Sequence, residues 1–225
     1  MNEKLFERSP IRAFEKATDG GLKAGELGLI TSKKGLGKTS VLVQFGMDTL
    51  LQEKQLVHVT FDQHSSNVIS WYASVFTEIA KKRNIGNAAE LLDEIVRKRT
   101  ILNFNQESFS LAKVAKTLSA LKSAGIEIAG VVADGLDLSK VSADDLKAFA
   151  DYAKEAGLGI WLSSTADGDS LNDSVSKELA PLFSIVAHLA AKADGVQVAV
   201  LKLRDKGEQP VALKLESKTS LIVAR

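Results

Sequence analysis

A glycine-rich segment between an apolar run and a helical pattern constrains the fold of this chain most. The segment is Ser32-Lys33-Lys34-Gly35-Leu36-Gly37-Lys38-Thr39; it follows Leu27-Gly28-Leu29-Ile30 and precedes a helical pattern from Ser40 to Leu51. A strand, a glycine-rich turn and a helix start form a cradle for phosphate, because backbone N–H groups converge there and the helix dipole adds positive charge. The sequence therefore predicts a nucleoside triphosphate site at this turn.

Several side chains of the turn have separate predicted roles. Lys38 brings a full charge to the β and γ phosphates, and the Thr39 hydroxyl ligates Mg²⁺. The phosphate-binding pattern G-x-x-x-x-G-K-[ST] begins with glycine, whereas this chain has Ser32. A side chain fits there only if the turn does not need a positive φ. The residues predicted to bind ATP here are Ser32, Lys33, Lys34, Gly35, Leu36, Gly37, Lys38, Thr39 and Ser40, and Lys33 and Lys34 could equally be exposed loop residues.

Composition limits the class of protein. The chain has 225 residues, and no linker or low-complexity tract divides it, so we predict a single domain over residues 1–225. A formal net charge of +1 provides no overall basic field to attract nucleic acid. The absence of cysteine excludes disulfides and thiolate metal sites. The stretch Met1 to Pro10 is charged and no apolar run is long enough for a membrane span, so we expect a cytoplasmic protein.

Apolar runs that suit strands alternate with patterns that suit helices as far as Leu162. Strands are predicted over Leu27–Thr31, Leu56–Phe61, Thr100–Phe104, Ile126–Ala133 and Leu158–Leu162. Helices are predicted over Lys38–Gln52, from Ser65 or Ser66 onward, and over Ala88–Arg99, Leu111–Ala124 and Ala143–Ala156. A mobile loop is predicted over Asp167–Ser176, and antiparallel strands over Ile185–Ala190, Val196–Leu203, Val211–Leu215 and Leu221–Val223. This order predicts an α/β fold with a doubly wound, mainly parallel sheet and antiparallel C-terminal strands.

Four polar residues fall at or just past predicted strand ends: Lys38, Asp62, Asp134 and Ser164. Ligands of doubly wound sheets bind at the carboxyl ends of the strands. We therefore expect these residues to share one site.

The chain resembles the RecA/DnaB/KaiC-type branch of P-loop ATPases. The resemblance lies in the stretch Gly20-Gly21-Leu22-Lys23-Ala24-Gly25-Glu26-Leu27 before the loop, and in two predicted strands between the loop strand and the strand that ends at Asp134. It implies a RecA-like P-loop core in which Asp134 is the Walker B aspartate that holds Mg²⁺ through water. The alternative is a strand-terminal aspartate that faces solvent or caps a turn.

The resemblance also implies catalytic positions. Asp62 stands where the family has its catalytic glutamate, with a side chain one methylene shorter, and it could instead cap the following helix. Ser164, between Ser163 and Thr165, stands where the family has a polar sensor of the γ-phosphate, although hydroxyl residues at strand ends also begin turns.

Lys202 and Arg204 resemble the Lys-x-Arg element that reaches a neighbouring subunit's nucleotide in ring-forming members of the family. Both alternate with leucines, so we expect both cations on one face of a strand. This interpretation implies a homo-oligomer or a related RecA-like subunit as partner. The alternative is a solvated edge strand whose charges discourage aggregation.

Three functions remain open from the sequence. The first is a slow, Mg²⁺-dependent ATPase whose nucleotide state controls oligomerisation or a partner. The second is a degenerate P-loop protein that serves as a nucleotide-responsive or structural interaction module without turnover. The third is a DNA recombinase paralogue, which the acidic loop residues Asp167, Asp169 and Asp173 argue against. Core packing explains Trp71 and Trp161 better than base stacking does.

Overall fold

The computed structural model of the chain describes residues 7, 9–61, 64–193 and 195–225. Asp62, the residue predicted to act as catalytic base, lies outside the described residues. Within them, every helix is too short or too polar to cross a bilayer.

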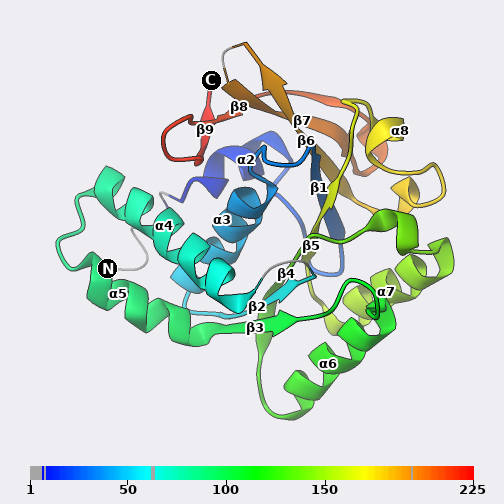
Figure 1. Cartoon of the computed structure of the whole chain (residues 1–225), viewed down its shortest axis with the longest axis horizontal. Helices are drawn as coiled ribbons and strands as arrows, with labels where there is room; N and C mark the ends of the chain where they lie inside the picture. Colours follow the sequence, from blue (N-terminus) through cyan, green and yellow to red (C-terminus); the bar gives the residue numbers. More distant parts are fainter. Residues whose placement is uncertain (1–6, 8, 62–63, 194) are drawn as a thin grey trace.

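A nine-stranded sheet runs through the described part of the chain, in the order β3-β2-β4-β5-β1-β6-β7-β8-β9 (Figure 1). All pairings from β3 to β6 are parallel, and those from β6 to β9 are antiparallel. The strands are β1 (Leu27–Ser32), β2 (Gln55–Thr60), β3 (Arg99–Asn103), β4 (Ile128–Asp134), β5 (Ile160–Thr165), β6 (Ile185–Lys192), β7 (Gly195–Leu203), β8 (Gln209–Leu215) and β9 (Ile222–Ala224). The predicted α/β class with a mainly parallel sheet and an antiparallel extension is confirmed.

One strand direction differs from the prediction. β6 was expected to be antiparallel to its neighbours, but it pairs in parallel with β1 and antiparallel only with β7. The connection from β5 crosses one end of the sheet to the other and includes a short helix, α8 (Leu171–Ser174), in a segment predicted to be a loop. Ser170 and Asp173 form a capping box at its start, which is a sequence signal for a helix N-terminus.

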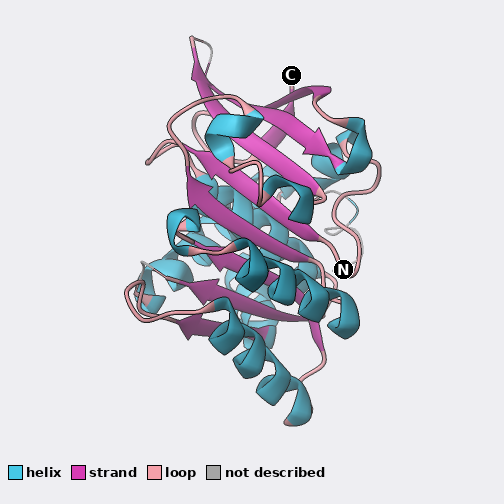
Figure 2. Ribbon diagram, turned by 90° about the vertical axis from the view of Figure 1, so that its right-hand side faces the viewer, coloured by secondary structure: helices cyan, strands magenta, loops and turns pink. Residues whose placement is uncertain are grey.

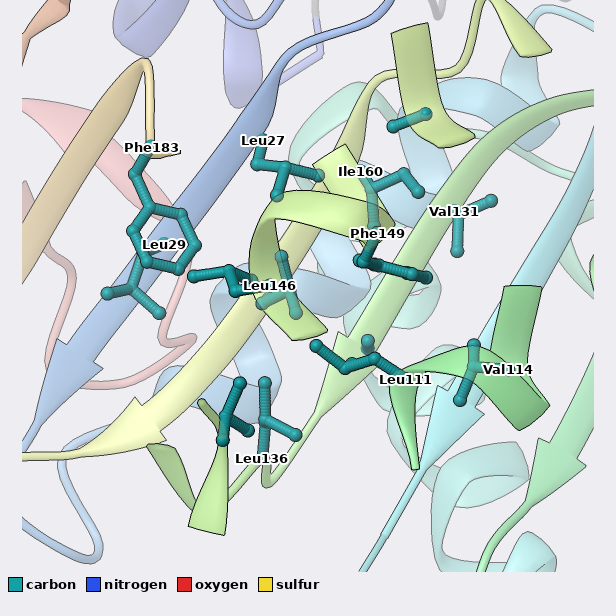
Figure 3. Packing of buried hydrophobic residues seen from close by; sticks show 14 of the residues in the cluster. Leu27, Leu29, Leu111, Val114, Val131, Leu136, Leu146, Phe149, Ile160 and Phe183 are labelled. Atoms are coloured by element: carbon teal, nitrogen blue, oxygen red, sulfur yellow. The ribbon is translucent and has the colours of Figure 1, made fainter. Parts of the chain in front are cut away.

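Helices cover both faces of the sheet (Figure 2). They are α2 (Ile11–Ala17), α3 (Lys38–Leu51), α4 (Ser65–Arg83), α5 (Ala88–Ile95), α6 (Leu111–Ser123) and α7 (Ala143–Ala156). One hydrophobic cluster joins the sheet to α6 and α7 through residues such as Leu29, Val131, Leu146 and Phe149 (Figure 3). Two others join the opposite face to α2, α3 and α4. Strands β4 and β5 read as continuous apolar runs because they are covered on both sides.

Two apolar runs proved longer than the strands that they contain. The predicted strands began at Ile126 and Leu158, whereas β4 begins at Ile128 and β5 at Ile160. Gly125 and Gly157 adopt positive φ angles of 88° and 66° after helices α6 and α7. The next residue in each case donates its N–H to a carbonyl of the preceding helix, at 3.1 Å for Ile126 and 2.9 Å for Leu158. The first apolar residues therefore belong to the C-terminal caps of the helices.

The two tryptophans occupy different environments. Trp161 is 6% exposed and stacks on Phe45 with ring centroids 4.4 Å apart, so its predicted role in core packing is confirmed. Trp71 is 37% exposed on α4, so the same prediction is wrong for that residue. The buried stripe of α4 runs through Val68, Tyr72, Val75, Phe76 and Ile79 and leaves Trp71 at its margin.

A buried histidine makes the stability of the fold sensitive to acid. His58 of β2 is fully buried, its Nδ1 lies 3.1 Å from the hydroxyl of Tyr72, and the Arg99 guanidinium lies over the Tyr72 ring. Burial, together with the charge of Arg99, lowers the pKa of His58 from 6.5 to about 3. Between these two pH values the unfolded chain binds a proton at this residue that the folded chain excludes.

We expect the free energy of unfolding to fall as the pH drops below about 6.5, with His58 contributing a slope approaching ~1.4 kcal/mol per pH unit. In His58→Gln this contribution disappears, so the curve between pH 6.5 and 4 becomes flatter, as urea unfolding at several pH values would measure. His64→Gln, at an exposed position before α4, is the matched control. Equal slopes in the wild type and His58→Gln would contradict the assignment.

Candidate functional site

The glycine-rich loop connects β1 to α3 without strain at its first position. Ser32 is the last residue of β1, is fully buried and lies outside the positive-φ region. Positive φ angles occur instead at Gly35 (85°) and Gly37 (102°), where only glycine fits easily. The condition under which a serine can replace the first glycine of the pattern is therefore met. Lys33 and Lys34 are exposed.

The side chain of Lys38 lies across this loop. Its Nζ donates hydrogen bonds to the Ser32 carbonyl oxygen at 3.1 Å, to Ser32 Oγ at 3.3 Å and to the Lys33 carbonyl oxygen at 3.4 Å. Burial lowers the pKa of Lys38, and the negative charge of Asp134 opposes that shift. The amine is thus half-desolvated beside the N-terminus of α3, where it and the helix dipole attract the same anion.

Hydroxyl groups hold both carboxylate oxygens of Asp134, the last residue of β4. Thr39 Oγ1 donates to Asp134 Oδ2 at 2.7 Å, and Ser163 Oγ donates to Asp134 Oδ1 at 2.6 Å. Thr39 comes from the first turn of α3, and Ser163 comes from β5. Hydroxyl and carboxylate oxygens are the ligands that Mg²⁺ prefers, so the side chains of Thr39 and Asp134 fit this ion.

A groove of about 990 Å³ opens beside these groups, and we call it the central groove. One wall is the loop from Lys34 to Thr39 with Asp134, and the opposite wall comes from the turn between β8 and β9, including Glu216 and Ser220. Trp71 lines the groove from α4. Pockets that hold small ligands have volumes of roughly 300–1,000 Å³, so this space suits a nucleotide.

Hydrogen bonds tie the turn between β8 and β9 to the loop helix. The Ser220 carbonyl accepts from Ser40 Oγ at 3.2 Å and from Gln44 Nε2 at 2.9 Å. Gln44 Oε1 in turn accepts from the Ile222 N–H at 2.8 Å. The hydroxyl of Ser40, which was predicted to bind nucleotide, thus faces this turn. On the other side, Lys82 Nζ lies 2.6 Å from Glu216 Oε2.

The three hydroxyl residues that end β5 have different surroundings. Thr165 is exposed and lines the central groove, whereas Ser164, the residue proposed as a sensor from sequence, is only 4% exposed. Alternate residues of a strand share a face, so Ser163 and Thr165 lie on one side and Ser164 on the other. This alternation was present in the sequence and favours Thr165 as the groove residue. Ser163 and Trp71 are the other two groups near the site that sequence reasoning did not assign to it.

Lys202 and Arg204 lie at the opposite edge of the sheet. β7 is antiparallel to β6, so it ends beside the start of β1, and the six residues of β1 separate this end from the loop by about 20 Å. The two side chains also do not share a strand face as predicted, because β7 ends at Leu203 and Arg204 has a φ of 50° in the next turn. Neither cation can therefore reach the loop of its own chain.

Both cations have partners within the chain. Arg204 donates to Glu26 through Nε at 2.8 Å and through Nη2 at 2.9 Å, and Nη2 also donates to the Gly21 carbonyl. Lys202 Nζ donates to the Phe183 carbonyl, and burial lowers the pKa of Lys202. The Arg204 side chain thus braces the turn that leads into β1.

The fold is similar to that of a solved structure, the ATPase domain of a DnaB-like helicase. The comparison gives a TM-score of 0.72 and 15% sequence identity, and covers 96% of this chain and 90% of that chain. No protein-family model matches the chain. No curated protein matches it either. The similarity establishes an α/β fold of the RecA-like P-loop NTPase type.

Proposed function

We propose that this chain is a Mg²⁺-dependent, ATP-binding RecA-like ATPase with slow turnover, whose nucleotide state controls self-association or a partner. The observation that carries the proposal is the convergence of Lys38, Thr39 and Asp134 at the N-terminus of α3, where Thr39 Oγ1 lies 2.7 Å from Asp134 Oδ2. The RecA-like fold, shared with the ATPase domain of the DnaB-like helicase, supports it.

Each group has a definite task in this proposal. The backbone N–H groups of the loop and the Lys38 ammonium bind the β and γ phosphates. Thr39 and Asp134 would hold Mg²⁺, which neutralises charge on the phosphate oxygens when it is bound. Thr165 lines the groove on the side of β5 and is placed to hydrogen-bond a terminal phosphate. Trp71 offers an exposed ring to the base.

A nucleotide-responsive module without turnover is the second candidate. Two observations favour it. Position 62 carries aspartate, whose side chain is shorter than that of the family's glutamate, and Arg204 is bound to Glu26 of its own chain. Release of phosphate at saturating Mg²⁺ and ATP separates the two candidates, because only the first produces it.

Trp71 provides a direct test of nucleotide binding. It lines the central groove, whereas Trp161 is buried beside Phe45. We expect titration with MgATP to change the tryptophan emission of the wild-type protein. Trp71→Phe should abolish this change and retain the steady emission of Trp161, while calorimetry still detects binding.

Two outcomes would count against this assignment. A fluorescence change that persists in Trp71→Phe would place the responding group elsewhere. An absence of heat on titration of the wild-type protein with millimolar MgATP would eliminate the nucleotide site and with it both candidates.

A further inference from the structure

Ser163 makes the most constrained polar contact near the site, and sequence reasoning gave it no separate role. Its side chain is fully buried in β5, and its Oγ lies 2.6 Å from Asp134 Oδ1 and 3.0 Å from the Gly135 backbone nitrogen. An amide N–H can only donate, so the Ser163 oxygen accepts from Gly135. The hydroxyl proton is therefore directed to the carboxylate of Asp134.

The second oxygen of Asp134 is held from the other side. Thr39 Oγ1 donates its proton to Asp134 Oδ2 at 2.7 Å, and this bond uses the proton of the hydroxyl rather than its lone pairs. The two hydroxyls thus hold the carboxylate between α3 and β5. Asp134 itself is 3% exposed, so its orientation depends on these neighbours more than on water.

The peptide that orients Ser163 is supported in turn. Gln106, in the loop after β3, donates from Nε2 to the Gly135 carbonyl oxygen at 2.7 Å. Gly135 follows Asp134 directly and has a φ of 82°, in the region that favours glycine. Loops and strands far apart in sequence therefore fix the same carboxylate.

We propose that Ser163 is a positioning residue for Mg²⁺, which sets the orientation of the Asp134 carboxylate before the ion arrives. This inference rests on the proposed function, since it assumes that the Asp134 carboxylate serves Mg²⁺ at the nucleotide. Mg²⁺ requires near-ideal octahedral geometry, so a carboxylate that rotates freely binds it or its water ligands less well. Loss of such an outer contact typically weakens metal binding by about 10- to 100-fold.

The chain offers a matched control in the next residue. Ser164 is also a buried serine of β5, but its side chain lies on the other side of the strand, and its Cα pairs with Thr31 of β1. Ser163→Ala and Ser164→Ala therefore remove the same hydroxyl from the same strand. Only the first change removes the hydrogen bond to Asp134.

The experiment measures ATP binding by calorimetry as a function of Mg²⁺ concentration, and again with EDTA in place of Mg²⁺. We expect Ser163→Ala to raise the Mg²⁺ concentration at half-maximal effect by about 10- to 100-fold and to leave metal-free ATP binding unchanged. Ser164→Ala should alter neither quantity. Mn²⁺ binding followed by electron paramagnetic resonance provides a second readout that requires no turnover.

Several outcomes would overturn the inference. An unshifted Mg²⁺ midpoint in Ser163→Ala, or an equal weakening of metal-free binding, would assign Ser163 a structural role only. If Ser163→Ala does not unfold cooperatively, Ser163→Cys has a similar size and a weak donor, and an unshifted midpoint in that variant would have the same meaning. A wild-type protein that binds no ATP at any Mg²⁺ concentration would remove the proposed function itself, whereas wild-type binding with an unshifted variant would remove this inference alone.

Discussion

Replacement of Lys38 by alanine is expected to weaken ATP binding by roughly 100-fold or more and to reduce phosphate release to background. The amine is the full positive charge that the loop aims at phosphate, and its Nζ already lies within 3.4 Å of three oxygens of Ser32 and Lys33. The loss of one such charged donor in a desolvated site costs about 3 kcal/mol, which corresponds to this factor in affinity. Calorimetry and the emission of Trp71 measure it.

A second lysine of the same loop provides the control. Lys34 is exposed and lies at the mouth of the central groove, so Lys34→Ala should weaken binding far less than Lys38→Ala. Thermal unfolding of both variants should match that of the wild type, because neither side chain belongs to a hydrophobic cluster. Equal affinities of the wild type and Lys38→Ala for MgATP would leave the fold intact and remove the nucleotide site.

Arg204→Ala is expected to lower phosphate release by roughly 10³-fold if the residue acts on a neighbouring copy, since an arginine supplied in trans contributes 10³- to 10⁵-fold to such reactions. The sheet separates Arg204 from the loop of its own chain, so only another copy can receive it. ATP binding should persist in this variant, because the central groove is intact. Lys206→Ala, two residues further along the chain and paired with Asp19 in an exposed ion pair, is the control.

Mixing two inactive variants tests the direction of this contribution. Lys38→Ala retains Arg204, and Arg204→Ala retains a complete loop, so mixed assemblies would contain some complete sites. We expect such a mixture to regain part of the phosphate release that each variant lacks alone. If the mixture stays inactive while the wild type is active, or if Arg204→Ala alone retains full activity, Arg204 serves only to brace Glu26.

The fold could be predicted in large part because its signals are local. Buried strands produce continuous apolar runs, and helices α6 and α7 end at glycines that adopt positive φ. The direction of β6 could not be deduced, since an apolar run has the same appearance in a parallel and an antiparallel pair. The connection before it contains only the short helix α8, which gave too weak a signal for a crossover.

The site was predictable to the extent that topology determined it. Lys38, Thr39 and Asp134 follow strands β1 and β4, and parallel strands bring such ends to one edge. The pairing of Arg204 with Glu26 joins residues 178 positions apart, and no local pattern encodes it. Trp71 was misjudged because helical spacing places it beside a buried stripe, and only the packed structure shows which margin faces the groove.

The carbonyl of Ser220 has a practical consequence for anyone who shortens or extends this polypeptide. Ser40 and Gln44 hold that carbonyl, and the Arg225 N–H donates to the Ala212 carbonyl at 2.8 Å. Deletion of the last strand would thus unfasten the first turn of α3, although it removes residues remote from it in sequence. An affinity tag fused directly after Arg225 would pull on the same attachment, so a flexible spacer should come before it.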